Sequence, residues 1–429
     1  NVTIYNDGSA VVREIRELDF KKGVADYSII DVAEKLNPAT VKIGLKNAYV
    51  MEQNFKYDLV SAQKILQKYI GKEVTLIGDK TIAGKLVSVA YNNVVIENKE
   101  GGLILVSKLD EYQVSVGAMP EGFVMYPTLV WKINSEKAGK QDVELLYQTN
   151  GMTWKAEYVA LLNQADNKID INAWLSLNNT SGKTYTDAKL KLMAGEVNRN
   201  TYDAPASYSK TVSIAQDRAM GAANEMATEK SFFEYHLYTV ENPTTIANNE
   251  QKQISMFDKT NIECRKVFKY NSFQYVNAEE PKNPTVFVEF ENAKKNNLGI
   301  PLPMGNVRIY KSDGTDKELI GETTIKHTPK DEKVELEIGE AFDIVIVEKM
   351  LKENRLSDRV TEIEYLAEFR NRKNEDAEIQ FDKSFYGQAE VLKSSIEPEK
   401  NEEARKVKFN VKIKADDTVK LTYKVRIQN

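Results

Sequence analysis

The stretch Arg405–Lys414, RKVKFNVKIK, shows the pattern that decides the fold. Every second residue is apolar, and these positions are Val407, Phe409, Val411 and Ile413. Because successive side chains of a β-strand point to opposite faces, this alternation predicts a strand with one buried face. The segment 418–428 repeats the pattern after a turn-like Ala415–Asp417. We therefore predict that the two strands form an antiparallel hairpin.

The same alternation recurs along most of the chain. It predicts further strands at Ile169–Leu177, Ala188–Met193, Val286–Phe290, Val334–Ile338, Ile363–Phe369 and Ala377–Phe381. Helical repeats between these segments are absent, and a parallel sheet normally needs crossover helices. The sequence therefore predicts an all-β protein whose antiparallel sheets stack as sandwiches.

Two segments depart from this pattern. Ser61–Tyr69 places its apolar residues on one helical face, with Ser61 as a candidate N-cap and Gly71 just past the end. The short strands between 72 and 116, separated by close turns, predict a small five-stranded barrel of the SH3-like or Sm-like kind. Alternation also stops between 203 and 230, which indicates an exposed connection.

A chain of 429 residues is too long for one hydrophobic core. The opening strands cannot bury a face alone and need later strands to close a sheet. We predict four parts. They are a first β-sandwich from 1–57 plus 118–212, an inserted small barrel with a leading helix at 58–117, a mobile or helical connection at 213–234, and a second β-sandwich at 235–429.

The composition of the chain excludes several classes of partner and site. Hydrophobic residues form 41% of the chain and the formal charge is only −5, without a basic stripe, so nucleic acid is excluded as an expected partner. Cys264 is the single cysteine, which rules out an intrachain disulfide and a cysteine-built zinc site. No run of about 18 apolar residues appears, so we expect no transmembrane segment in the given chain.

Few residues are candidates for chemistry. Cys264 and the two histidines, His236 and His327, are better explained as structural, so no catalytic residue, metal site or cofactor is predicted. The segment Asp313–Asp316 resembles the start of a calcium loop, but Asp-Gly is also a common turn, and we favour the turn. Trp174 lies on the polar side of its predicted strand, so it is a candidate for stacking on a ligand, or it packs beneath a neighbouring loop or domain.

Several stretches resemble a known family. They include YQTNGMTWKAEYVALL at 147–162, AWLSLNNTSGKTYTDAKLKLMAGEVNR at 173–199, YHLYTVENPTTIANNEQKQISMF at 235–257 and NNLGIPLPMGNVRIYKSDG at 296–314. In their order and spacing they are similar to the bacterial exported proteins related to the mucoidy inhibitor A family, whose defining domain has no known function. The chain resembles the shorter branch, because the small barrel stands where some relatives have a coiled-coil-like segment.

The resemblance implies an exported β protein of the periplasm or cell surface, whose signal peptide is expected to have been removed, and it brings no catalytic residues. We expect a non-enzymatic structural or interaction protein of the cell envelope, with protein partners or self-assembly through strand edges. Carbohydrate binding or glycan hydrolysis is the alternative, and enzymatic activity stays open at this point.

Overall fold

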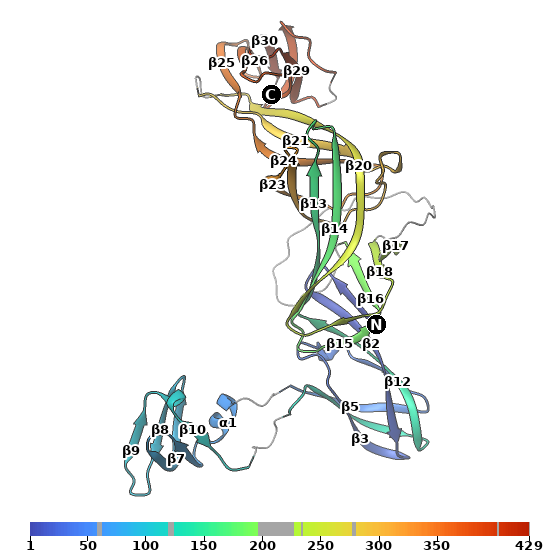
Figure 1. Cartoon of the computed structure of the whole chain (residues 1–429), viewed down its shortest axis with the longest axis vertical. Coiled ribbons are helices and arrows are strands. Elements are labelled where there is room, and N and C mark those ends of the chain that lie inside the picture. The colour runs from blue at the N-terminus through green and yellow to red at the C-terminus, as the bar shows by residue number, and fades with distance from the viewer. Residues whose placement is uncertain are drawn as a thin grey trace. The chain divides into compact units, whose positions relative to one another are not determined.

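The fold was taken from a computed structural model that describes residues 1–57, 62–118, 124–195, 227–232, 235–276, 280–400 and 403–428 (Figure 1). The protein is all-β, as the sequence predicts, with 65% of its residues in strands and 4% in helices. The chain divides into two compact units. Unit 1 comprises 1–153, 178–191 and 243–251, and unit 2 comprises 154–177, 192–242 and 252–429.

Unit 1 contains two antiparallel ladders outside the small sheet. Its strands are β1 (Val2–Tyr5), β2 (Ser9–Phe20), β3 (Gly23–Ile30), β4 (Lys42–Gly44), β5 (Ala48–Lys56), β11 (Thr128–Ser135), β12 (Gly139–Asn150), β15 (Tyr185–Ala188) and β19 (Thr244–Ile246), with a 3-10 turn at Pro38–Thr40. One ladder runs β1-β2-β12-β4 and the other β3-β11-β5, while β15 pairs with β19. Trp131 and Tyr147 are fully buried, which places the core of unit 1 on the inner faces of β11 and β12.

The small sheet has its own core. It consists of α1 (Ala62–Lys68), β6 (Glu73–Ile77), β7 (Thr81–Ala90), β8 (Asn93–Glu97), β9 (Leu103–Val106) and β10 (Gln113–Ser115), with a 3-10 turn at Leu109–Glu111. The predicted helix and five strands are thereby confirmed, in the sheet order β10-β6-β7-β8-β9. Leu66 and Tyr69 pack with the buried face of the sheet. Only glycine fits at Gly84, where a Cβ atom would lie 2.3 Å from the Glu97 carbonyl oxygen.

Unit 2 holds most of the longest strands. They are β13 (Met152–Leu162), β14 (Lys168–Asn179), β16 (Leu190–Ala194), β17 (Ala227–Phe232), β18 (Tyr235–Val240), β20 (Glu250–Phe273), β21 (Thr285–Glu291), β22 (Gly305–Ser312), β23 (Lys317–Ile325) and β24 (Lys333–Glu340), with a 3-10 turn at Lys294–Asn296. The C-terminal strands are β25 (Ile344–Arg355), β26 (Val360–Asn371), β27 (Ala377–Ser384), β28 (Gln388–Ser394), β29 (Lys406–Ile413) and β30 (Thr418–Gln428).

The prediction of purely antiparallel sheets is wrong at two places. The main sheet of unit 2 runs β23-β22-β13-β14-β20-β21-β24, and β13 pairs with β22 in parallel. The end of β20 also pairs in parallel with β27, which continues antiparallel into β29. In both pairs the connection passes through other strands, so no crossover helix is needed.

The predicted C-terminal hairpin is also wrong. β29 pairs with β27, whereas β30 lies between β26 and β28 in a separate sheet of order β25-β26-β30-β28. The apolar faces of β29 and β30 meet across one core, where the rings of Phe409 and Tyr423 lie 5.1 Å apart. Two strands that each have one apolar face can bury it face to face as well as side by side, and this pair packs face to face.

The two units do not follow the domain boundaries predicted from the sequence throughout. Residues 154–177 belong to unit 2, although the sequence places them in the first sandwich, because β13 and β14 share a sheet with β22 and β20. Within the predicted connection at 213–234, residues 227–232 form strand β17 paired with β18. The rest of that connection lies outside the described residues.

Candidate functional site

Four polar side chains meet inside the core of the C-terminal strands, and we call Ser272, Glu348, Lys383 and Tyr423 the buried network. The Lys383 amine is fully buried and lies 2.5 Å from Glu348 Oε1 and 3.1 Å from Ser272 Oγ. Ser272 donates a hydrogen bond to Glu348 Oε2 at 2.5 Å, and Tyr423 donates to Oε1 at 3.0 Å. The four residues come from β20, β25, β27 and β30, so the network joins both sheets of this core.

The electrostatics of the network follow from its burial. Desolvation lowers the pKa of the Lys383 amine, although the charge of Glu348 acts in the opposite direction. The amine also lies 4.4 Å from the centre of the Tyr365 ring, where a cation is attracted to the aromatic face. Both carboxylate oxygens of Glu348 are engaged by donors, so the arrangement satisfies a buried ion pair.

The buried tyrosines predict a loss of stability at alkaline pH. Burial raises the pKa of Tyr270 to about 12, and it also raises the pKa values of Tyr365 and Tyr423 well above their usual range. The unfolded chain ionises these phenols near pH 10 while the folded chain keeps their protons, so the stabilisation is complete below pH 10 and declines above it. Lys383 acts in the opposite direction, because its pKa is lower in the folded chain than in the unfolded chain and its contribution to stability therefore rises with pH between those two values. The three tyrosines together outweigh this single lysine.

Urea unfolding measured between pH 9 and pH 11 checks this prediction. Each tyrosine contributes a decline of at most about 1.4 kcal/mol per pH unit above pH 10. Tyr423→Phe should make the decline shallower, since phenylalanine has no proton to lose. A free energy of unfolding that stays level to pH 11 would contradict the prediction.

The opposite side of the same strands carries exposed aromatic rings. In β20 and just after it, the side chains of Ser272 and Gln274 point inward, and those of Phe273 and Tyr275 point outward. Phe273 is 70% exposed and Tyr275 is 55% exposed. In β27 the register places Ser384 beside Phe273, and Tyr386 follows just past the strand with 71% exposure. We define the outer face as Asn271, Phe273, Tyr275, Asp382, Ser384 and Tyr386.

Core contacts hold these rings in place. Gln274 is buried, its carbonyl accepts a hydrogen bond from Tyr365 at 2.8 Å, and its Oε1 accepts one from the Tyr386 backbone N–H at 3.2 Å. The rings of Tyr275 and Tyr386 are 6.3 Å apart. The outer face is therefore a positioned surface, since residues anchored in the core set the backbone beneath it.

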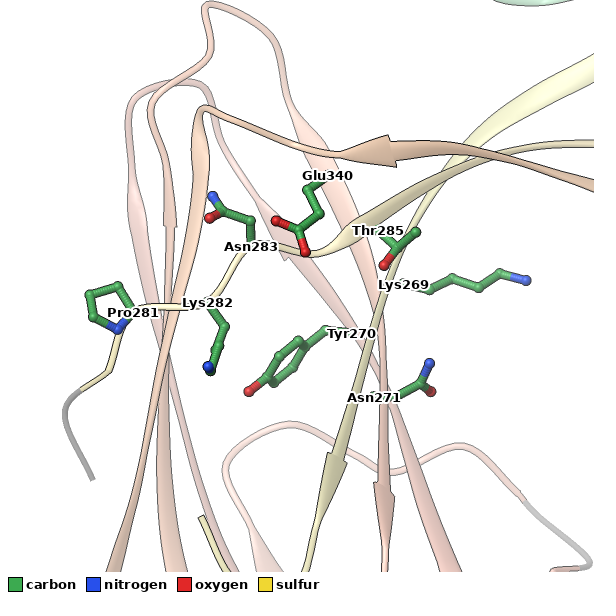
Figure 2. A pocket seen from close by; sticks show the side chains of 8 residues that line it. All are labelled: Lys269, Tyr270, Asn271, Pro281, Lys282, Asn283, Thr285 and Glu340. Atoms are coloured by element: carbon green, nitrogen blue, oxygen red, sulfur yellow. The ribbon is translucent and has the colours of Figure 1, made fainter. Parts of the chain in front are cut away.

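A polar hollow of about 400 Å³ lies nearby in unit 2 (Figure 2). It is lined by Lys269, Tyr270, Asn271, Pro281, Lys282, Asn283, Thr285 and Glu340. Figure 2 shows Tyr270 and Lys282 reaching into this space, while Lys269 extends away from it. The Asn283 amide donates to the carbonyls of Ala341 and Ile344, at 2.9 and 2.8 Å, so it serves to hold the loop.

The residues singled out from the sequence lie apart from the outer face. Trp174 is half-buried in β14, on the side opposite the buried Ala173 and Leu175, so its role in stacking stays a prediction. Cys264 is half-buried in β20, and burial followed by the charge of Asp166 raises the pKa of its thiol to about 12. A thiol with a raised pKa is a poor nucleophile at neutral pH.

The two histidines and the turn at Asp313 also lie in unit 2. Exposed His327 accepts a hydrogen bond at Nδ1 from the Met304 backbone N–H at 3.1 Å, and His236 is half-buried in β18. The turn at Asp313 is confirmed, because its Oδ1 accepts from the backbone N–H groups of Thr315 and Asp316 between β22 and β23. Over the described ranges, no three His, Cys, Asp or Glu side chains gather closely enough to hold a metal ion.

Sequence reasoning missed both the buried network and the outer face. The available signal is the run SFQY at 272–275, in which small or polar residues alternate with aromatic ones. Read by alternation alone, Phe273 and Tyr275 would face the core, but the structure buries Ser272 and Gln274 instead.

The structure was also searched for membrane-spanning helices, and the chain was compared with known proteins. In the part of the chain that the structure describes, no helix combines the length and apolar character required to cross a membrane. Comparison with family models, with curated proteins and with solved structures finds no match to this chain.

Proposed function

We propose that this chain is an exported, non-enzymatic structural or interaction protein of the bacterial cell envelope, and that it self-associates through a strand edge. Export and an envelope location, in the periplasm or at the cell surface, rest on the family resemblance. Self-association rests on strand β9 of the small sheet.

Strand β9 combines an open edge with exposed apolar side chains. It stands at one end of the five-stranded sheet, and among the described residues β8 is the only strand that pairs with it. Ile104 and Val106 pack on the core of the small sheet, whereas Leu103 is 60% and Leu105 is 76% exposed. An edge strand with apolar outward residues is a template for adding another strand.

A second copy of β9 suits this edge. Antiparallel pairing of two copies centred on Ile104 would set Leu103 of each beside Leu105 of the other, which gathers four leucines on one face. So short a ladder buries less than about 1,000 Å², so we expect a weak, concentration-dependent dimer.

Leu105→Glu tests this proposal. Two like charges would meet in the leucine cluster, so we expect dimerisation to weaken at least about tenfold, because charge burial and lost apolar contact act together. Sedimentation velocity over a concentration series measures this change. Leu319→Glu is the matched control, since Leu319 is 50% exposed on β23 in unit 2 and should leave the dimer unchanged.

Two results would overturn the assignment. Wild-type chain that sediments as a monomer at every concentration removes self-association, and a dimer that Leu105→Glu leaves intact places the contact elsewhere. Export is tested separately, by fractionating cells of the native source, and recovery in the cytoplasm would contradict it.

A further inference from the structure

The outer face carries a second inference that does not depend on β9. Its three rings, from Phe273, Tyr275 and Tyr386, are between 55% and 71% exposed. Large aromatic side chains in water each leave apolar area uncovered that a partner can bury. Grouped at the ends of two adjacent parallel strands, they form one surface instead of three scattered residues.

The surroundings of the rings indicate the chemistry of the partner. The positions that continue this side of β27 and β29 are polar or charged, and they include Gln380, Asp382, Ser384, Lys408 and Asn410. A protein-binding hot spot normally places aromatic anchors within a wider apolar contact area. Here the aromatic rings meet hydrogen-bonding groups directly, which suits a ligand that is apolar on one surface and hydroxylated along its edge.

A pyranose ring has this character. When its substituents are equatorial, its two faces present C–H bonds that can stack on the negative face of an aromatic ring, and its hydroxyls point outward around the edge. The carboxylate of Asp382, the hydroxyl of Ser384 and the amide of Asn271 lie on the same side of the strands as the rings.

The charges favour an uncharged glycan. Lys406 lies 3.7 Å from Asp382 and 3.1 Å from Glu403, and Lys408 lies 2.9 Å from Glu403. Cations beside the outer face are therefore balanced by neighbouring carboxylates, which leaves no surplus positive charge to attract an acidic polymer. We infer that the outer face binds a neutral polysaccharide of β-1,4-linked pyranose rings with equatorial substituents.

Binding of soluble oligosaccharides to the full chain tests this inference. Isothermal titration with cellohexaose and chitohexaose should give measurable affinity for at least one of them, whereas a mannan oligosaccharide, whose axial hydroxyl breaks the flat ring face, should bind more weakly. Phe273→Ala and Tyr386→Ala should each lower the affinity about tenfold or more, because each removes an aromatic contact together with the apolar area that it buries.

Matched variants separate stacking from folding. Tyr386→Phe keeps the aromatic ring and should retain binding. If Tyr386→Phe binds and Tyr386→Ala does not, the missing ring explains the loss of binding. Tyr91→Ala removes a tyrosine that is 93% exposed on the small sheet, and it should leave binding unchanged. The β9 variant Leu105→Glu should also bind normally, so the two proposals fail independently.

Three outcomes would overturn the inference. They are no binding of either hexasaccharide by the intact chain, unchanged affinity in the Phe273→Ala and Tyr386→Ala variants, and capture of a protein partner that depends on Tyr386 while neither hexasaccharide binds.

Discussion

Replacing Lys383 by methionine is expected to lower the stability of the C-terminal core by about 3–5 kcal/mol. The substitution nearly preserves the volume of the side chain but removes the charge that faces Glu348 at 2.5 Å. The carboxylate would then be buried without its counter-charge, and its remaining donors, Ser272 and Tyr423, cannot neutralise it. Hydrogen exchange measured by mass spectrometry on peptides from β26 and β27 reports the free energy of opening in this region.

A matched control and a double variant identify the cause. Lys412→Met removes a lysine whose side chain is 80% exposed in β29, and it should change stability by less than about 0.5 kcal/mol. Adding Glu348→Leu to Lys383→Met removes the orphaned charge and should restore much of the loss, because an apolar pair is often at least as stable as a buried ion pair. A loss below about 1 kcal/mol for Lys383→Met would contradict the argument.

Replacing Asn179 by alanine is expected to destabilise unit 1 by about 2–4 kcal/mol. Asn179 is fully buried, and its amide donates to the carbonyls of Lys183, Ile246 and Ala247 at 2.8, 3.2 and 3.0 Å. Its oxygen accepts from the backbone N–H and the hydroxyl of Ser181. Alanine would leave these groups buried without partners, which costs far more than one exposed hydrogen bond.

The neighbouring residue provides the control for this prediction. Asn178 is exposed, so Asn178→Ala should be nearly neutral. Asn179→Asp keeps the acceptor but loses both donors, and it should be at least as damaging as alanine because it places a carboxylate against carbonyl oxygens. Hydrogen exchange in peptides covering β15 and β19 measures the effect, and equal behaviour of the 178 and 179 variants would refute it.

Local sequence signals predicted the strands well. The clean alternation of β29 and β30 and the short alternating runs of the small sheet appear in the structure where the pattern places them. Helix α1 also follows from its spaced apolar residues and flanking Gly71. These elements could be read because their alternation depends only on residues a few positions apart.

Pairing between strands was much harder to predict. β20 lies beside β27, and β13 beside β22, although more than a hundred residues separate the members of each pair. Alternation says that a strand has a buried face, but the same face can be covered by any sheet in the chain. The predicted hairpin of β29 and β30 is wrong for this reason. Both strands were predicted correctly, but each pairs with a different strand from the one expected.

What the sequence by itself determined is that this chain folds into β-sheets with one apolar and one polar face, because that pattern is local and has the period of a strand. Only the tertiary structure decided where polar side chains are buried and aromatic side chains are exposed, contrary to that pattern. Glu348 and Lys383 are buried only because β20, β27 and β30 bring three donors to the Glu348 carboxylate, and the Lys383 amine is one of them. Phe273 and Tyr386 are exposed because residues of alternate positions in the same strands point inward. Burial of polar groups depends on partners distant in the chain, and no local pattern contains them.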